Sequence, residues 1–188
     1  VTAAIDSIKK LGIKVRIHKD YCEIDGNGIN GFKYKKNLII NAKNSGTLGR
    51  LLLGLLIKSP QKIKLIGDKS LSKRDFSRVT QPLKKFGAKF YFKSKNKLPL
   101  TILGSKSIKS IKYLENKGSA QCKSSVMFAA LNASGITSIK AKKSRNHSEL
   151  LFKFLKIPIK VKVDKKYDFI DIKQPKKIKA FNYKIPGD

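Results

Sequence analysis

The residues of this chain best suited to chemistry lie in four short polar segments, each between a strand-like run and an apolar helical pattern. They are Asn44-Ser45-Gly46-Thr47-Leu48-Gly49-Arg50, Gly67-Asp68-Lys69-Ser70-Leu71-Ser72-Lys73-Arg74, Gly118-Ser119-Ala120-Gln121-Cys122-Lys123-Ser124 and Ser144-Arg145-Asn146-His147-Ser148-Glu149. The first backbone N–H groups of a helix have no partner within the helix, and its dipole favours negative charge there. Hydroxyls and cations at such starts therefore predict the binding of an anionic ligand.

Arg74 is the strongest single candidate for an anion contact, because a guanidinium can donate two parallel hydrogen bonds to carboxylate or phosphate oxygens. Gly46 would let a ligand approach the backbone without a Cβ in the way. Ser119 and Gln121 fall in the first turn of a predicted helix, where hydroxyl, amide and N–H groups can grip a phosphate. Each segment alone also fits an ordinary capped helix.

The fourth segment predicts a helix that begins with a capping box, in which Asn146 and Glu149 satisfy first-turn N–H groups. Ser144 and Arg145 precede this box and would be free to face a ligand. His147 fits a structural residue of the first turn better than a catalyst. The sequence offers no nucleophile with its base, no carboxylate cluster and no metal-ligand set, so it predicts binding without a complete catalytic apparatus.

The elements that position these segments follow a β-α-β-α-β-β pattern that occurs twice, which predicts an α/β fold of the α+β type. The first copy has strands over 38–41, 63–66, 89–92 and 100–103, and helices over 45–57 and 75–86. The second has strands over 108–113, 137–141, 160–163 and 169–172, and helices over 119–133 and 147–155. In such a repeated layer the helix starts are expected to collect at one edge.

The two ends of the chain and one proline complete these expectations. A helix that ends at Gly12 and a hairpin over 13–24 open the chain, and a strand over 179–188 closes it. Pro82 lies inside an apolar helical pattern and predicts either a kink or a helix that begins near Thr80. The chain has no initiator Met and opens within a helical pattern, which suggests a fragment.

The net charge of +31, from 43 basic and 12 acidic residues, would by itself suggest a polyanion such as nucleic acid. Only five of the cations are arginine, the residue that nucleic-acid readers use for bidentate contacts. The lysines are scattered through every segment, which favours a composition bias on solvated surfaces. A basic nucleic-acid-binding module nevertheless stays open as the alternative from a different class. Three of the five arginines, Arg50, Arg74 and Arg145, fall at predicted helix starts.

Two cysteines and the hydropathy pattern bear on the compartment. Cys22 and Cys122 lie far apart without metal-ligand spacing, so no zinc site is expected and a reducing cytoplasm is the default. The longest apolar run, 51–57, is far shorter than the roughly 20 residues that span a bilayer. No signal-peptide pattern is present, and no membrane association is expected.

Taken together and in order, the four segments resemble those of the 5-enolpyruvylshikimate-3-phosphate (EPSP) synthase family, the 3-phosphoshikimate 1-carboxyvinyltransferases. The resemblance covers nearly the whole chain and implies most of one lobe of a two-lobed fold built from β-α-β-α-β-β units. Residues 1–31 would be the second half of an incomplete unit, and 36–104 and 106–174 would be complete units. Residues 175–188 would form the strand that crosses to the second lobe, with Pro186-Gly187-Asp188 at the crossing.

The resemblance implies a transferase of aromatic amino acid biosynthesis in the shikimate pathway. The carboxyvinyl (enolpyruvyl) group of phosphoenolpyruvate would move to the 5-hydroxyl of shikimate 3-phosphate with release of phosphate. The enzyme would be cytoplasmic, monomeric at full length and independent of cofactors, and glyphosate would compete near Gly46. By position, the phosphoenolpyruvate contacts would be Gly46, Arg74 and Gln121. The shikimate 3-phosphate contacts would be Ser119, Ala120, Gln121, Ser144 and Arg145.

Departures from the family pattern limit what this chain is expected to do. The family's N-terminal Lys-Ser and Arg motif and its second-lobe acidic residues are absent from these 188 residues, which implies a fragment that is inactive alone and holds no catalytic residue. Arg50 would match a structural or electrostatic position. A lobe of UDP-N-acetylglucosamine enolpyruvyl transferase, which shares the fold, is the closer alternative. That family carries a cysteine in a mobile Gly-rich loop, where neither Cys22 nor Cys122 lies.

Overall fold

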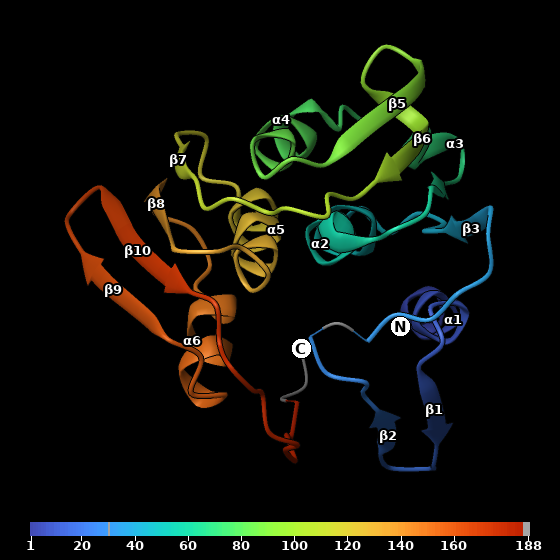
Figure 1. Cartoon of the computed structure of the whole chain (residues 1–188), viewed down its shortest axis with the longest axis horizontal. Coiled ribbons are helices and arrows are strands. Elements are labelled where there is room, and N and C mark those ends of the chain that lie inside the picture. The colour runs from blue at the N-terminus through green and yellow to red at the C-terminus, as the bar shows by residue number, and fades with distance from the viewer. Residues whose placement is uncertain (30, 186–188) are drawn as a thin grey trace.

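Two four-stranded sheets of identical strand order hold most of the chain in the computed structural model, which describes residues 1–29 and 31–185 (Figure 1). The first has the order β3 (Leu38–Asn41), β4 (Ile63–Ile66), β6 (Lys97–Leu103), β5 (Lys89–Ser94). The second has the order β7 (Lys112–Glu115), β8 (Ile136–Lys142), β10 (Tyr167–Lys173), β9 (Ile159–Val163). In each sheet the first two strands pair in parallel and the others antiparallel.

Helices connect the strands of each sheet. The first sheet is accompanied by α2 (Gly46–Leu55), the 3₁₀ turn η1 (Leu56–Lys58), α3 (Lys69–Lys73) and α4 (Ser77–Lys85), and the second by α5 (Ala120–Ala130) and α6 (His147–Phe154). Figure 1 shows α2 and α5 at the centre of the molecule. The chain opens with α1 (Thr2–Lys10) and the predicted hairpin, β1 (Lys14–Ile17) with β2 (Cys22–Asp25). No helix within the described ranges is long and apolar enough to cross a membrane.

The core is continuous across both sheets because α2 and α5 pack closely against each other. A Cβ added to Gly54 of α2 would lie 2.1 Å from the backbone oxygen of Ser125 in α5, so only glycine fits there. Ser125 also donates a hydrogen bond of 2.8 Å from its hydroxyl to the carbonyl of Arg50. Small residues at this crossing thus let two helix backbones approach and bury the leucines on either side.

Most predicted elements are present, with four differences. The short helix α3 was missed, and β7 occupies 112–115 instead of 108–113. Ile108 and Ile111 are buried by packing, and the chain before β7 pairs only through an isolated bridge at Lys109 within the described part. Helix α4 includes Pro82 and begins at Ser77, so the predicted start near Thr80 is wrong: the N–H of Val79 already bonds the carbonyl of Phe76.

The strand predicted at the C-terminal end is the fourth difference. Residues 179–185 form no strand, and the predicted crossing residues Pro186-Gly187-Asp188 lie outside the described residues. The rings of Phe181 and Tyr183 instead pack edge-on against Phe154 of α6, at centroid distances of 5.9 and 5.2 Å. This segment is therefore held by aromatic contacts and not by a strand ladder.

We expect Gly54→Ala to destabilise the chain, because its Cβ would collide with the backbone oxygen of Ser125 at the α2–α5 crossing. Such overpacking lowers the free energy of unfolding by about 1–3 kcal/mol, measurable by urea denaturation. Gly26→Ala is the matched control, since no atom lies within 4 Å of a Cβ at that position. Equal stability of the two variants would contradict this account of the core.

Candidate anion-binding site

The site is built where α2 and α5 begin side by side. The side chain of Gln121, at the start of α5, donates a hydrogen bond of 2.7 Å to the hydroxyl of Thr47, at the start of α2. Further along both helices, Arg50 contacts Ser125 and Gly54 contacts Ser125. Because these contacts advance in the same direction, the two helices are parallel. Both N-termini, with their free N–H groups and positive dipole ends, therefore lie at one end.

Two guanidinium groups face Gly46 in the first turn of α2. A Cβ built on Gly46 would lie 2.8 Å from Nη1 of Arg50 and 3.1 Å from Nη1 of Arg74. Arg50 also donates a hydrogen bond of 2.8 Å to Oε1 of Gln121 and lies over the ring of Phe76, 5.3 Å from its centroid. These contacts fix Arg50, and the missing side chain of Gly46 lets both cations lie against the first turn of α2.

Arg74 reaches this position because of the local structure of the turn before α4. The carboxylate of Asp68 accepts a hydrogen bond of 2.7 Å from the N–H of Leu71 and so caps α3. Leu71 is fully buried and anchors that short helix to the core. Arg74 then ends α3 with an extended backbone, and its side chain is directed back toward α2.

A pocket of about 430 Å³ opens between these helix starts, lined by Arg50, Arg74, Asp75, Arg78, Ser119, Gln121 and Cys122. Burial, together with the charges of Arg74 and Arg78, lowers the pKa of the Arg50 guanidinium. Hydrogen bonds from Ser77 lower the pKa of Asp75, so this carboxylate is charged at neutral pH and partly offsets the three arginines. An anion in the pocket would relieve the remaining repulsion among the cations.

The start of α5 is organised by Glu115, whose side chain is buried at the end of β7. Glu115 accepts hydrogen bonds from the N–H of Ser119 at 2.9 Å, the N–H of Lys117 at 3.2 Å and the guanidinium of Arg78 at 3.3 Å. The hydroxyl of Ser119 accepts one from the N–H of Cys122 at 3.3 Å. Within the described part of the chain, the N–H groups of Ala120 and Gln121 have no partner, and they remain as donors for a ligand.

The fourth segment, before α6, lies next to α5 but outside this pocket. Arg145 is exposed, and the hydroxyl oxygen of Ser144 is buried without a partner among the described residues. The predicted capping box is wrong: Asn146 makes no side-chain cap, and Glu149 turns inward to Lys123. The physical reason is that Lys123 is fully buried, and a buried ammonium requires a counter-charge.

Of the predicted site residues, the structure brings Gly46, Arg74, Ser119, Ala120 and Gln121 together at the α2 and α5 starts. Ser144 and Arg145 lie outside this group and precede α6, where the hydroxyl of Ser148 donates a hydrogen bond of 2.7 Å to that of Ser124 in α5. The sequence interpretation missed Asp75, Arg78 and Glu115. Arg78 lies close to Arg74 in the sequence, which could have indicated it; the role of Glu115 depends on contacts between distant segments. No group of three metal-ligating side chains occurs within the described ranges.

Comparisons with known proteins match this chain to one family, and the match covers the whole chain. The sequence model of the family described as EPSP synthase (3-phosphoshikimate 1-carboxyvinyltransferase) matches residues 1–188. The 3-phosphoshikimate 1-carboxyvinyltransferase of Caldicellulosiruptor bescii is 39% identical over 188 residues, which cover 99% of this chain and 43% of the relative. The protein of the same name in Bacillus subtilis is 35% identical over a match that covers 99% of this chain and 42% of that relative.

Solved structures give the same result. The chain superposes on EPSP synthase from Acinetobacter baumannii with a TM-score of 0.84 and 30% sequence identity, over 94% of this chain and 39% of that protein. The chain therefore spans about 43% of the length of the curated relatives that it matches.

We expect Gly46→Ala to weaken binding of inorganic phosphate about tenfold, because the new Cβ would push both guanidinium groups away and a charge-assisted hydrogen bond contributes roughly 1.5–3 kcal/mol. Affinity is measured by NMR titration at fixed ionic strength. Gly49→Ala, in the same helix, is the control, because its Cβ would meet the Phe76 ring at an ordinary 3.5 Å. Unchanged phosphate affinity in the Gly46 variant, or an equal loss in both, would argue against the pocket as the anion site.

Proposed function

This chain belongs to the EPSP synthase family, and we propose that it contributes one substrate-binding wall of a 3-phosphoshikimate 1-carboxyvinyltransferase. The substrates are phosphoenolpyruvate and shikimate 3-phosphate, and the carboxyvinyl group passes to the 5-hydroxyl of the latter as phosphate is released. The observation that carries the proposal is the convergence of Arg50, Arg74 and Arg78 with two helix N-termini around one pocket. Both substrates are small, multiply anionic molecules of the kind that such a pocket suits.

Phosphoenolpyruvate is assigned to Gly46, Arg74 and Gln121. The absence of a side chain at Gly46 supports this assignment, since it lets a guanidinium nitrogen of Arg50 and one of Arg74 come close to the α2 backbone. A guanidinium can fork onto carboxylate or phosphate oxygens, and it stabilises the charge that develops on the departing phosphate. Arg50 contributes charge and also holds the Gln121 side chain in place through their hydrogen bond of 2.8 Å.

Shikimate 3-phosphate is assigned to Ser119, Ala120, Gln121, Ser144 and Arg145. The unpartnered N–H groups of Ala120 and Gln121 support this assignment, because they point from a helix start where a phosphate is favoured. The N–H of Ser119 is already used by Glu115, so its contribution comes from the hydroxyl. Arg145 is exposed and can turn toward a ligand.

The wider properties of the enzyme follow as part of the same proposal. Residues 36–104 and 106–174 are two complete repeat units, 1–31 is half of another, and 175–188 leads to a second lobe that carries the acid–base groups. The enzyme needs no cofactor, acts in the cytoplasm and is a monomer at full length. The chain itself binds and orients the substrates, and the proton transfers take place on groups outside it.

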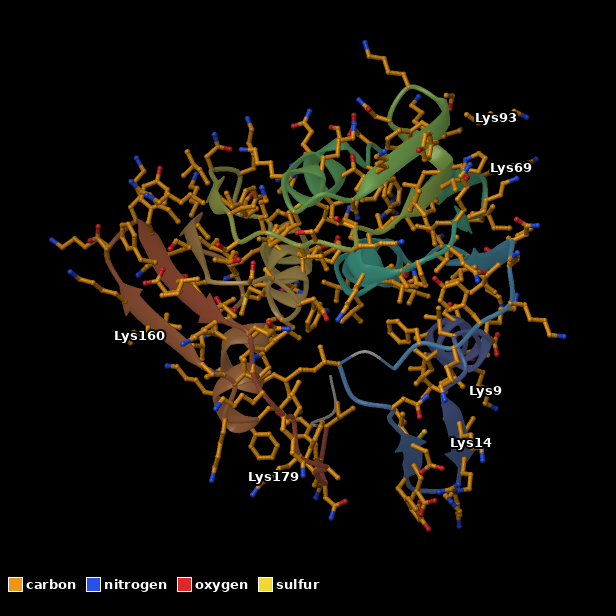
Figure 2. All side chains as sticks on the ribbon, in the orientation of Figure 1. Lys9, Lys14, Lys69, Lys93, Lys160 and Lys179 are labelled. Atoms are coloured by element: carbon orange, nitrogen blue, oxygen red, sulfur yellow. The ribbon has the colours of Figure 1, made fainter. Side chains whose placement is uncertain are left out.

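Neither alternative is favoured. Curated relatives from Caldicellulosiruptor bescii, Streptococcus mutans and Streptococcus pyogenes, at 34–40% identity, carry the carboxyvinyltransferase name and not that of the UDP-N-acetylglucosamine enzyme. A nucleic-acid-binding module would be expected to gather its cations in one stripe. Figure 2 instead shows its labelled lysines on separate elements around the whole molecule, directed outward: Lys9, Lys14, Lys69, Lys93, Lys160 and Lys179.

We expect the 188-residue chain to bind shikimate 3-phosphate weakly and Arg145→Ala to weaken it further, by about five- to tenfold, the value of one exposed charge-assisted contact. Binding is followed by NMR titration or calorimetry. Arg16→Ala is the control, because Arg16 pairs with Glu23 and Asp25 in the distant hairpin. Unchanged titration shifts in the Arg145 variant would count against the assignment, and a steep salt dependence on single-stranded DNA would favour the nucleic-acid alternative.

We expect no turnover of the two substrates by the 188-residue chain alone. A chimera in which these residues replace the matching 43% of the Caldicellulosiruptor bescii relative is expected to be active. Arg74→Ala in that chimera should then lower kcat/KM by about 10²–10³, as expected for loss of one preorganised charge contact. Phosphate release measures the rate, and circular dichroism checks the fold. Turnover by the isolated chain, or a folded chimera that is indifferent to Arg74→Ala, would overturn the proposal.

A further inference from the structure

Lys123 and Glu149 form a buried ion pair between the first turns of α5 and α6. Nζ of Lys123 lies 2.6 Å from Oε1 of Glu149, and their side chains are 0% and 5% exposed. Nearly every other lysine of this chain is exposed, so the burial of Lys123 sets it apart. Removing an ammonium from water is costly and is tolerated only with a well-placed counter-charge.

A second polar contact lies directly beside the ion pair. The hydroxyl of Ser148 donates a hydrogen bond of 2.7 Å to the hydroxyl of Ser124. Consecutive residues of α5, Lys123 and Ser124, thus contact consecutive residues of α6, Ser148 and Glu149. We call these four residues the α5–α6 clamp.

The clamp joins the two segments assigned to shikimate 3-phosphate. On α5 it follows Ser119–Gln121 by about one turn, and on α6 it follows Ser144–Arg145 by about one turn. The far half of α6 is held separately, because Phe152 is buried and its ring contacts that of Phe128 in α5 at 5.8 Å. The clamp is therefore not needed to attach α6 but sets where its N-terminal end lies.

The use of Glu149 in the clamp also leaves the start of α6 uncapped. Asn146 makes no side-chain cap, and the N–H groups of His147 and Ser148 have no partner among the described residues. A glutamate at this position would ordinarily reach back to satisfy such a group. The start of α6 thus keeps free donors next to Arg145.

We propose that the α5–α6 clamp is a positioning device, which fixes Ser144–Arg145 at one distance from Ser119–Gln121 so that both segments act on a single phosphorylated ligand. This inference rests on the proposed function for the identity of that ligand, shikimate 3-phosphate. An ion pair suits the task better than an apolar contact, because two charges buried 2.6 Å apart cannot separate without leaving each charge buried and uncompensated, whereas apolar side chains can slide over each other.

The test uses the double variant Lys123→Met/Glu149→Leu in the 188-residue chain, because a single substitution would leave an unpaired buried charge. The control, Lys173→Met/Asp171→Leu, makes the same charge change at exposed positions of β10. We expect the clamp variant to fold, with amide hydrogen exchange over residues 144–149 accelerated at least tenfold. Its affinity for shikimate 3-phosphate should fall about tenfold, and that for phosphoenolpyruvate should not change.

Each outcome decides the matter. A folded double variant with unchanged exchange over 144–149 and unchanged shikimate 3-phosphate affinity overturns the clamp, as does an equal loss for both substrates, which indicates a merely structural role. If the double variant does not fold, Ser148→Ala removes only the hydroxyl contact; faster exchange with a two- to threefold affinity loss supports the clamp, and no change overturns it. If the unaltered chain binds no shikimate 3-phosphate, the proposed function is refuted. Amide hydrogen exchange over residues 144–149 would still test whether the clamp holds the start of α6.

Discussion

The close approach of α2 and α5 is the constraint on which the rest of the molecule depends. It exists because Gly54 presents no side chain to the carbonyl of Ser125. The hydroxyl of Ser125 also donates a hydrogen bond to the backbone carbonyl of Arg50 in α2. Two helices packed this closely and in parallel must begin at the same end, and each brings its free N–H groups there. The site is thus a consequence of core packing: the same crossing that joins the two sheets into one core also sets Thr47, Arg50 and Gln121 in contact.

Local charge, and not the net charge of +31, defines the site. Exposed lysines are solvated individually and screened within a Debye length of about 8 Å at physiological salt. Arg50 differs because it is half-buried, lies beside Arg74 and Arg78, and is held by Phe76 and Gln121. Two carboxylates, Asp75 and Glu115, moderate this repulsion without filling the pocket. An anion that enters meets donors already in place, so little reorganisation is needed when it binds.

The sequence was sufficient to predict the hairpin, the long helices and the fold class, because these depend on local periodicity and on residue types at helix starts. The sequence-based prediction failed where contacts between residues far apart in the sequence determine the local structure. Glu149 fits a capping box by its position in the sequence, yet its carboxylate forms an ion pair with the buried ammonium of Lys123. Ile108 and Ile111 were predicted to lie in a strand, yet they are buried in the core before β7 begins. The five-residue α3 is too short to produce a periodic pattern and depends on its Asp68 cap.

A structure of the 188-residue chain with bound shikimate 3-phosphate would test the central claim most directly, namely that helix N-termini and a few fixed arginines, and not the lysine-rich surface, hold the anion. The account predicts phosphate oxygens within hydrogen-bonding distance of the Ala120 and Gln121 N–H groups, with the Arg145 side chain turned onto them. A phosphate found instead on exposed lysines, with the α5 start empty, would contradict it.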